Sequence, residues 1–177
     1  MIYWIPIIIV LLALVYLLLR VFFSFLTISL FGGAYFARTS NRRLKQVLKL
    51  ANLKPGDKLL DLGSGDGQIV SAAAGLGVQA DGVEINPFYV CLSRQKIKHQ
   101  MLSGKAKIYQ ADLWHFNTHA YSVVVVYGIG YMMGRLRRKL EQELKPGTKV
   151  ISVYFPFPGW RLVKKLEDVK LYIIDKI

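Results

Sequence analysis

Cysteine and acidic residues are scarce in this chain of 177 residues, which has one cysteine, Cys91, and eleven Asp and Glu residues against twenty-four Lys and Arg. A single cysteine excludes a disulfide within the chain and is typical of a reducing compartment. The three histidines, His99, His115 and His119, lack the spacing of metal ligands, so we predict no metal site. The net charge of +13 has three possible explanations: attraction to anionic lipid headgroups, binding of nucleic acid, or simply solubility and the positive-inside bias of a membrane protein.

Charge is also nearly absent from the N-terminal segment. Ile2–Leu19 carries no charged side chain, and only Arg20 interrupts the apolar run before Phe31. Eighteen helical residues span about 27 Å, close to the thickness of the hydrocarbon core of a membrane. The segment lacks the basic start and the small-residue cleavage site of a signal peptide. We therefore predict a retained transmembrane anchor over residues 1–34 and a separate globular domain over residues 35–177, and this anchor favours lipid over nucleic acid as the anionic partner.

Arg20 leaves two arrangements of the anchor open. In the one that we favour, Ile2–Leu19 crosses the membrane and Val21–Phe31 is a second helix in the membrane surface, with Arg20, Ser24 and Thr27 on one face. In the other, a single tilted helix contains both segments. Lys and Arg are absent before the span and frequent after it, so the positive-inside rule places the domain on the cytoplasmic side, or on the matrix side in a mitochondrion.

Beyond the anchor, short apolar runs alternate with helical patterns, and the chain closes on two runs that can form an antiparallel hairpin. This alternation predicts an α/β fold, a Rossmann-like doubly wound sheet whose ligands bind at the carboxyl ends of the strands. The expected strands are 58–60, 79–84, 106–110, 122–127 and 149–155, the hairpin is 161–166 with 169–174, and the helices are 39–50, 68–74, 87–102 and 131–144.

A glycine-rich loop follows the first expected strand. It reads Asp61-Leu62-Gly63-Ser64-Gly65-Asp66-Gly67, and it leads into a helix. Glu84 ends the next strand, where a carboxylate can accept hydrogen bonds from both hydroxyls of a ribose. Asp112, in the segment Gln110–Trp114, can accept a hydrogen bond from an adenine amino group, or it can be an ordinary turn residue. Together these positions predict a nucleoside-shaped ligand.

The spacing Asp61-x-Gly63-x-Gly65-x-Gly67 resembles the first motif of class I methyltransferases that depend on S-adenosylmethionine (SAM). The resemblance implies SAM as the cofactor and S-adenosylhomocysteine as the product. An acidic residue before the glycines suits a cofactor with a cationic amino acid end better than it suits a pyrophosphate. The cofactor-binding residues that it implies are Asp61, Gly63, Ser64, Gly65, Gly67, Glu84, Ile85, Asn86, Asp112, Leu113 and Tyr127.

Five segments resemble the small membrane-anchored protein-lysine methyltransferases that modify the ATP synthase c subunit and the adenine nucleotide translocase. The resemblance implies a membrane-anchored protein-lysine N-methyltransferase whose substrate is a membrane protein with an accessible lysine. The chain departs from the family where Tyr35-Phe36-Ala37 replaces a Tyr-Val-Pro pattern, and its short C-terminus favours a prokaryotic member. The segments are Tyr35–Thr39, Asp61–Gly67, Val83–Pro87, Asp112–Trp114 and Tyr154–Trp160.

Transfer of a methyl group to lysine requires a neutral amine, and deprotonating a free lysine at pH 7 costs about 4–5 kcal/mol. A dry aromatic pocket lowers this cost and can hold the methylated ammonium afterwards. We predict that Tyr35, Tyr127, Phe155 and Trp160 line such a pocket, with no assigned base. For Phe157, a place in this pocket and ordinary core packing are equally well supported.

Two other functions remain open at this stage. The first is methylation of a lipid headgroup or a membrane-soluble small molecule, and the second is a SAM-binding scaffold, associated with RNA or membrane, without turnover. Tyr127-Gly128-Ile129-Gly130 follows the fourth strand in place of an Asn/Asp-Pro-Pro-Tyr motif or a catalytic cysteine. By resemblance to the families that carry those motifs, this disfavours methylation of adenine N6, of glutamine and of cytosine C5, so nucleic acid is a less favoured partner.

Overall fold

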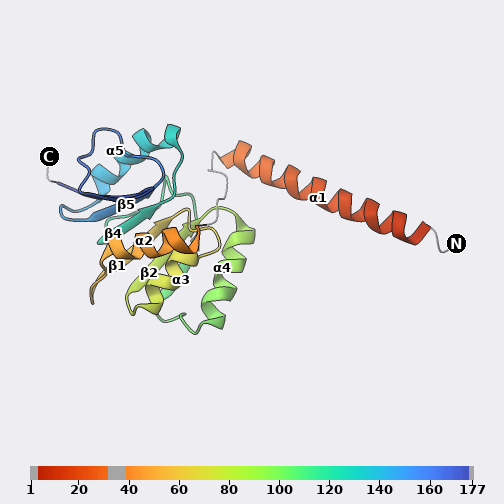
Figure 1. The fold of residues 1–177 in the computed structure, drawn as a ribbon, viewed down its shortest axis with the longest axis horizontal. Helices are drawn as coiled ribbons and strands as arrows, with labels where there is room; N and C mark the ends of the chain where they lie inside the picture. The colour runs from red at the N-terminus through yellow and green to blue at the C-terminus, as the bar shows by residue number, and fades with distance from the viewer. Residues whose placement is uncertain (1–3, 32–38, 176–177) are drawn as a thin grey trace. The chain divides into compact units, whose positions relative to one another are not determined.

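The computed structural model describes residues 4–31 and 39–175, and it divides into two units, Met1–Tyr35 and Phe36–Ile177 (Figure 1). The first unit contains one helix, α1 (Trp4–Phe31). Its segment Ile5–Phe22 is apolar and long enough to cross a membrane, with a mean hydropathy of 2.8 and none of it buried. Tyr35, Phe36 and Ala37, which belong to the first of the five segments named above, lie outside the described residues.

The helix α1 continues through Arg20, so the predicted division into two helices is wrong and the single-helix alternative holds. The physical reason is local, because neither glycine nor proline occurs between Ile7 and Phe31. A lone arginine does not break backbone hydrogen bonding in a helix that has no other interruption. At 1.5 Å per residue, this helix is about 42 Å long.

The second unit is built on a seven-stranded sheet with the order β3-β2-β1-β4-β5-β7-β6. The first five strands are parallel, and β7 pairs antiparallel with both β5 and β6. This confirms the predicted doubly wound sheet and its terminal hairpin. The strands are β1 (Lys58–Leu62), β2 (Gln79–Glu84), β3 (Ala106–Gln110), β4 (Val123–Val126), β5 (Lys149–Val153), β6 (Lys164–Leu166) and β7 (Val169–Ile173).

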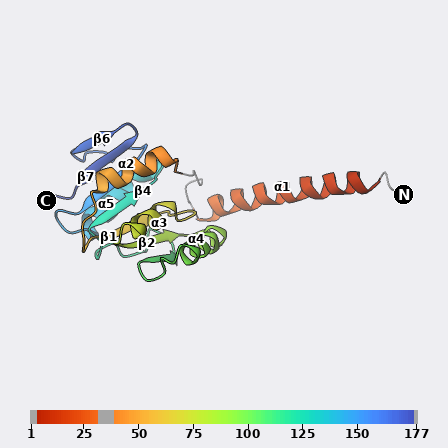
Figure 2. The same cartoon turned by 60° about the horizontal axis from the view of Figure 1, so that its bottom comes forward.

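Helices cover both faces of the sheet. Neighbouring helices α2, α3 and α4 contact one another along one face, and α5 covers the other (Figure 1, Figure 2). Ser40 caps α2 and Asn86 caps α4, each with a side-chain oxygen that accepts a backbone N–H. The helices are α2 (Asn41–Ala51), α3 (Gln68–Gly75), α4 (Pro87–His99), η1 (Gly130–Met132, a 3-10 turn) and α5 (Met133–Glu143).

Strand residues alternate between two cores. In β4, Val123 and Val125 belong to the cluster that packs under α2, α3 and α4, whereas Val124 and Val126 are buried outside that cluster. The alternation places Asp61 of β1 on the same face as Leu59, beneath the glycine loop and α3. The residue that starts the candidate site is therefore fixed by the same pleat that forms the core.

Among the predicted boundaries that shift in the structure, two lie near the candidate site. The strand expected to reach Phe155 ends at Val153, because Tyr154 adopts a left-handed backbone conformation with φ of 68°. The helix expected over residues 131–144 begins as the 3-10 turn η1 and becomes α-helical only at Met133. Both changes occur at the carboxyl edge of the sheet, where the candidate site lies.

Two features of the structure favour glycine at position 67, so a substitution there tests the packing of this loop. Its φ is +72°, and a Cβ at this position would lie 2.7 Å from the Cβ of Ser93 on α4. We expect Gly67→Ala to lower the free energy of unfolding by about 2–4 kcal/mol, through strain and overpacking together. Urea unfolding of the full chain in detergent, followed by circular dichroism, measures the change.

Gly134→Ala in α5 is the matched control. Nothing lies within 4 Å of a Cβ at Gly134, and its φ is not positive. Since alanine favours helix over glycine by up to about 1 kcal/mol, this variant keeps or gains stability. Equal losses in both variants would show that the loop at Gly67 is not packed as described.

Candidate cofactor and substrate site

The predicted site residues gather where the strand order reverses. Chain connections run from β1 toward β2 and β3 on one side, and through β4 and β5 on the other. Ligands of open α/β sheets bind at such a reversal, beyond the carboxyl ends of the strands. Leu62 pairs with Val126, so Gly63 and Tyr127 are the next residues on two neighbouring strands. The glycine loop and the aromatic residue after β4 therefore lie side by side at this edge.

The glycine loop is held by the end of β2. The backbone N–H groups of Gly63 and Ser64 both donate to Val83 O, at 2.9 Å each. Gly63, Gly65 and Gly67 have φ values of 86°, 51° and 72°, which side chains with a Cβ rarely adopt. A Cβ at Gly63 would meet no atom within 4 Å, so the space above this residue is open. The loop thus presents bare backbone to a ligand.

Asp61 is buried beneath this loop without a complete set of partners. Its side chain is 2% exposed, and its Oδ1 has no hydrogen-bond partner among the described residues. Burial raises the pKa of Asp61 to about 8, and the nearby charges of Glu84 and Asp66 add to the effect. A buried carboxylate in this situation is stabilised by a cation. The site therefore favours a ligand with a positively charged group above Asp61.

Glu84 is held in place by two backbone donors. Its Oε2 accepts from Gly65 N at 2.9 Å, and its Oε1 accepts from Asn86 N at 2.8 Å. A carboxylate has about four acceptor positions, so two remain for a ligand. Asn86 caps α4 through Phe88 N at 3.0 Å, and Ile85 between them is half-buried. These backbone donors thus set the orientation of the Glu84 carboxylate.

Asp112 forms a turn at the end of β3. Its Oδ1 accepts from Trp114 N at 3.0 Å, and its Oδ2 lies 2.8 Å from His115 Nδ1. Ala111 N donates to Glu84 O at 3.1 Å, so this turn is attached to the end of β2. Leu113 is half-buried next to it. Asp112 is therefore a turn residue, which was one of the two roles considered from the sequence. The attachment of this turn to the end of β2 also places Asp112 beside Glu84.

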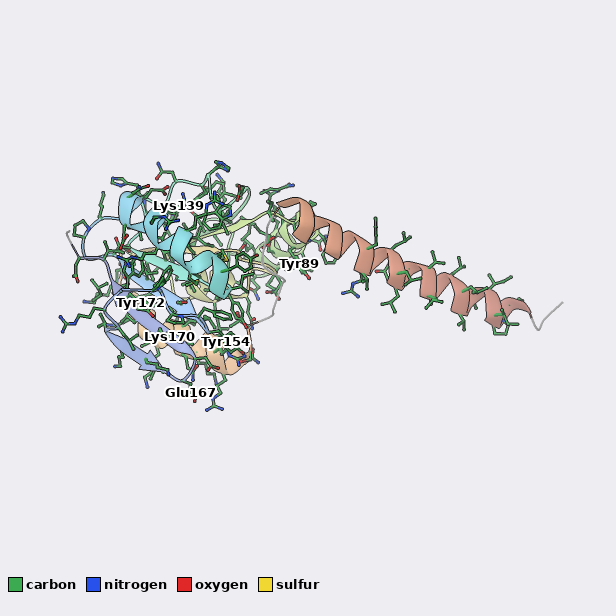
Figure 3. The ribbon with its side chains drawn as sticks, turned by 90° about the horizontal axis from the view of Figure 1, so that it is seen from above. Tyr89, Lys139, Tyr154, Glu167, Lys170 and Tyr172 are labelled. Carbon is green, nitrogen blue, oxygen red and sulfur yellow. The ribbon has the colours of Figure 1, made fainter. Side chains whose placement is uncertain are left out.

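An aromatic pair that includes Tyr154 lies beyond β4 and β5. The rings of Tyr127 and Tyr154 meet edge to face, with centroids 5.4 Å apart. Arg43 of α2 covers the Tyr154 ring at 4.4 Å and pairs with Asp168 at 3.3 Å. Figure 3 shows Lys170 beside Tyr154, whose carbonyl oxygen accepts from Lys170 Nζ at 2.6 Å. Burial, followed by a hydrogen bond with Tyr154, raises the pKa of Tyr127 to about 12, so this phenol is neutral.

Tyr154 and Arg43 were not among the site residues expected from the sequence. Tyr154 lay inside a predicted strand, and Arg43 belongs to a helix that contains none of the motifs. The one signal for Tyr154 was its place at the start of the segment Tyr154–Trp160. Nothing in the sequence indicated its left-handed φ, which turns it out of the strand, and its backbone N–H donates instead to Asp168 O at 2.9 Å.

The other predicted aromatic residues divide between two places. Phe155 is 40% exposed and lies against Gly130, where a Cβ would be 3.4 Å from its ring. Trp160 instead packs with buried Phe157, at a centroid distance of 4.3 Å, and with Tyr172, at 5.7 Å. Its Nε1 donates to Glu141 Oε1 at 2.6 Å. These contacts favour a packing role for Trp160 and place Phe155 nearer the open edge.

No group of three or more His, Cys, Asp or Glu side chains in residues 4–31 and 39–175 is arranged to hold a metal ion. The acidic side chains Asp61, Glu84 and Asp112 lie at or just after the carboxyl ends of β1, β2 and β3. The strand order, the antiparallel β7, the acid-glycine loop after β1 and the acid at the end of β2 together define the class I SAM-dependent methyltransferases.

Within that class, the chain belongs to the ANTKMT methyltransferase family, because the profile of the ANTKMT methyltransferase domain matches residues 61–164. The lysine N-methyltransferase of the ATP synthase c subunit from Rattus norvegicus is 43% identical over 125 residues, which cover 71% of this chain and 57% of that protein. The protein-lysine N-methyltransferase of Saccharolobus islandicus (strain REY15A) is 33% identical over 148 residues, covering 78% of this chain and 92% of that protein.

A solved structure gives the same fold. The RNA methyltransferase from Salinibacter ruber in complex with S-adenosyl-L-homocysteine superposes with a TM-score of 0.75 and 32% identity, covering 80% of this chain and 95% of the other. The chain spans only 57% of the length of the rat protein. Because the family profile matches residues 61–164, membership of the family is established for the globular unit.

The buried Asp61 predicts an unusual dependence of stability on pH. Its pKa is about 8 in the folded chain, against an ordinary value of 3.8. Between these values the folded chain binds more protons than the unfolded chain, so the free energy of unfolding falls as the pH rises. We expect Asp61→Asn, which cannot ionise, to gain about 2–4 kcal/mol relative to the parent chain between pH ~5 and pH ~8. Urea unfolding without added ligand measures this.

Asp57→Asn is the matched control, because the pKa of Asp57 is lowered where that of Asp61 is raised. Burial tends to raise the pKa of Asp57, but hydrogen bonds from Lys54 N–H and the Ser122 hydroxyl, with the charge of Lys149, hold it below its ordinary value. Its proton is lost below pH ~4 in both states, so the difference between this variant and the parent stays constant from pH ~5 to pH ~8. A constant difference for Asp61→Asn as well would contradict the raised pKa.

Proposed function

We propose that this chain is a membrane-anchored protein-lysine N-methyltransferase that uses SAM and acts on a membrane protein. The observation that carries the proposal is the position of the edge-to-face Tyr127–Tyr154 pair beside a glycine loop that covers buried Asp61, whose Oδ1 has no hydrogen-bond partner among the described residues. The names of the rat and Saccharolobus relatives support lysine as the acceptor. The domain boundary that we propose places the anchor in residues 1–34 and the enzyme in residues 35–177.

The residues of the glycine loop and the neighbouring strand ends fit SAM. Asp61 Oδ1 accepts from the ammonium of the cofactor, which restores the partner that this buried atom lacks. The free acceptor positions of Glu84 receive the ribose hydroxyls, and Asp112 and Leu113 contact the adenine. Backbone groups of Gly63, Ser64, Gly65 and Gly67 cradle the cofactor, and Ile85, Asn86 and Tyr127 complete its surroundings. SAM, when bound, supplies an electrophilic methyl group.

The chain then has to position and deprotonate the lysine. Tyr127, Tyr154 and Phe155 form an aromatic wall next to the loop, which excludes water and disfavours the ammonium form. The guanidinium of Arg43, stacked on Tyr154, adds repulsion against a second cation. The neutral phenol of Tyr127 orients the amine through a hydrogen bond. We assign no general base, since positioning alone accounts for a large share of such a rate. Tyr35 remains a proposed fourth wall residue, outside the described part of the chain.

The apolar helix α1 supports the membrane part of the proposal. Its exposed apolar segment Ile5–Phe22 has the length of a membrane span, and the basic residues that follow favour a cytoplasmic or matrix location for the enzyme. Anchoring confines the enzyme and a membrane-bound substrate to one bilayer, which raises their effective concentration. The names of the relatives specify such substrates, the ATP synthase c subunit and, for a mouse protein 38% identical to this chain, the adenine nucleotide translocase.

The Salinibacter structure motivates a second candidate, methylation of RNA. That protein is named an RNA methyltransferase, and the net charge of +13 suits a polyanion.

One experiment distinguishes the candidates. The full chain in detergent is incubated with methyl-labelled SAM and with membranes and total RNA from its source, and protein, lipid and RNA are separated. Label mapped to lysine in a membrane protein supports the proposal, and label confined to RNA or to lipid overturns it.

Glu84 tests the cofactor half of the site. Glu84→Gln loses the charge and one of the two acceptors that hold Gly65 N and Asn86 N, while ribose also loses acceptors. We expect SAM affinity to fall by about 10- to 100-fold, or roughly 1.4–2.8 kcal/mol, by calorimetry. The control is Glu167→Gln, because Glu167 lies in the β6–β7 turn and pairs with Arg42. Equal affinities for both variants would remove Glu84 from the cofactor site.

Tyr127 tests the substrate half. Tyr127→Phe keeps the ring contact with Tyr154 and removes the hydroxyl, so kcat should fall by about 10²-fold while SAM affinity is unchanged. Tyr172→Phe is the matched control, since the Tyr172 hydroxyl accepts from Phe157 N at 3.3 Å inside the aromatic cluster around Trp160. A loss of kcat in Tyr172→Phe and not in Tyr127→Phe would move the lysine pocket to that second cluster.

A further inference from the structure

The exposed aromatic side chains of the described residues 39–175 all lie at one edge of the sheet. Phe88, in the first turn of α4, is 65% exposed, and Tyr131, in η1, is 74% exposed. Tyr154 and Phe155 follow β5 and are 37% and 40% exposed. These residues come after the carboxyl ends of β2, β4 and β5, so they surround the candidate site.

The opposite edge of the sheet has exposed apolar residues of a different kind. Leu76 follows α3, Met101 follows α4, and Ile173 ends β7 opposite the start of β5. These side chains are aliphatic or thioether, and they precede or flank the amino ends of the parallel strands. Tyr and Trp gather at the boundary between lipid and water, and Phe is common on protein surfaces that insert into this boundary. The distribution therefore distinguishes the two edges chemically.

The chain also enters the globular unit at the aromatic edge. Asn41, the first residue of α2, accepts from Gln68 Nε2 at 3.2 Å, and Gln68 directly follows the glycine loop. Arg43, two residues further along α2, lies on Tyr154. From Phe31, the last residue of α1, to Asn41, a fully extended chain spans at most about 35 Å. The segment that follows α1 therefore joins the globular unit at the aromatic edge.

We propose that the carboxyl edge of the sheet faces the lipid–water interface, with Phe88 and Tyr131 inserted among the headgroups. The inference rests on the membrane anchoring in the proposed function and adds an orientation to it. Arg135, one helical turn after Tyr131 and stacked on Trp114 at 4.1 Å, is exposed at the same edge and suits anionic headgroups. The site then opens toward the bilayer, and the substrate is a lysine close to the membrane surface.

Spin labels measure this orientation directly. In a Cys91→Ser background, one nitroxide is attached to each of Phe88→Cys, Tyr131→Cys, Leu76→Cys and Met101→Cys. A fifth label at Leu12→Cys reports on α1. The full chain is reconstituted in vesicles of equal phosphatidylcholine and phosphatidylglycerol, and relaxation by oxygen, which prefers lipid, is compared with relaxation by a water-soluble nickel chelate. We expect labels 12, 88 and 131 to favour oxygen, and labels 76 and 101 to favour nickel.

The fifth label separates the two claims. If label 12 lies in lipid while labels 88 and 131 match labels 76 and 101, the orientation is overturned and the anchoring stands. If label 12 also lies in water, both are overturned. Shielding of labels 88 and 131 that appears only after a substrate membrane protein is added assigns the aromatic edge to protein docking and overturns the lipid contact.

A rate measurement complements the labels. The double variant Phe88→Ser with Tyr131→Ser should reduce methylation in vesicles roughly tenfold, because a misaligned site reaches its lysine less often. SAM affinity should stay unchanged, which also shows that the variant is folded. Leu76→Ser with Met101→Ser is the matched pair at the other edge and should keep the parent rate. Equal rates for the two pairs overturn the proposal.

Discussion

The backbone hydrogen bonds between the glycine loop and the end of β2 are the constraint on which the whole site depends. Val83 O accepts from two successive N–H groups of the loop, and the Glu84 carboxylate holds Gly65 N. The loop reaches these acceptors only with three left-handed glycines. These few contacts set the direction of β1 at its end, the position of the Glu84 carboxylate and the start of α3. The loop is therefore held in its shape by the end of β2.

The same loop carries an electrostatic cost that only function explains. Asp61, Glu84 and Asp66 lie close together, and of the three only Asp66 has an ion pair with a described lysine, Lys96 at 3.1 Å. Burying a carboxyl group without a cation destabilises the folded chain. Proteins commonly accept such a cost where a ligand later removes it. In the function proposed above, a positively charged cofactor would remove this cost, which links the raised pKa of Asp61 to the proposed chemistry.

The aromatic segment near the C-terminus shows where a sequence motif divides into two structures. Trp160 and Phe157 turn toward Tyr172 and α5, where they form a packed cluster. Tyr154 and Phe155 turn toward the open edge instead, because the left-handed φ of Tyr154 ends β5 before them. One half of this motif therefore packs in the core, and the other half lies at the candidate site. The pair Tyr127–Tyr154 joins residues 27 positions apart, and Arg43 reaches it from more than 80 residues before Tyr127.

The sequence alone determined the doubly wound sheet, its terminal hairpin and the position of the acid-glycine loop, because these follow from alternating apolar runs, glycine spacing and the rule that parallel strands end at one edge. The extent of α1 and the end of β5 were not determined in this way, since they depend on a weak local interruption at Arg20 and on one backbone angle at Tyr154. Only the tertiary structure decided which aromatic residues meet. Contacts such as Arg43 with Tyr154 join distant parts of the chain, and local patterns carry no information about that distance.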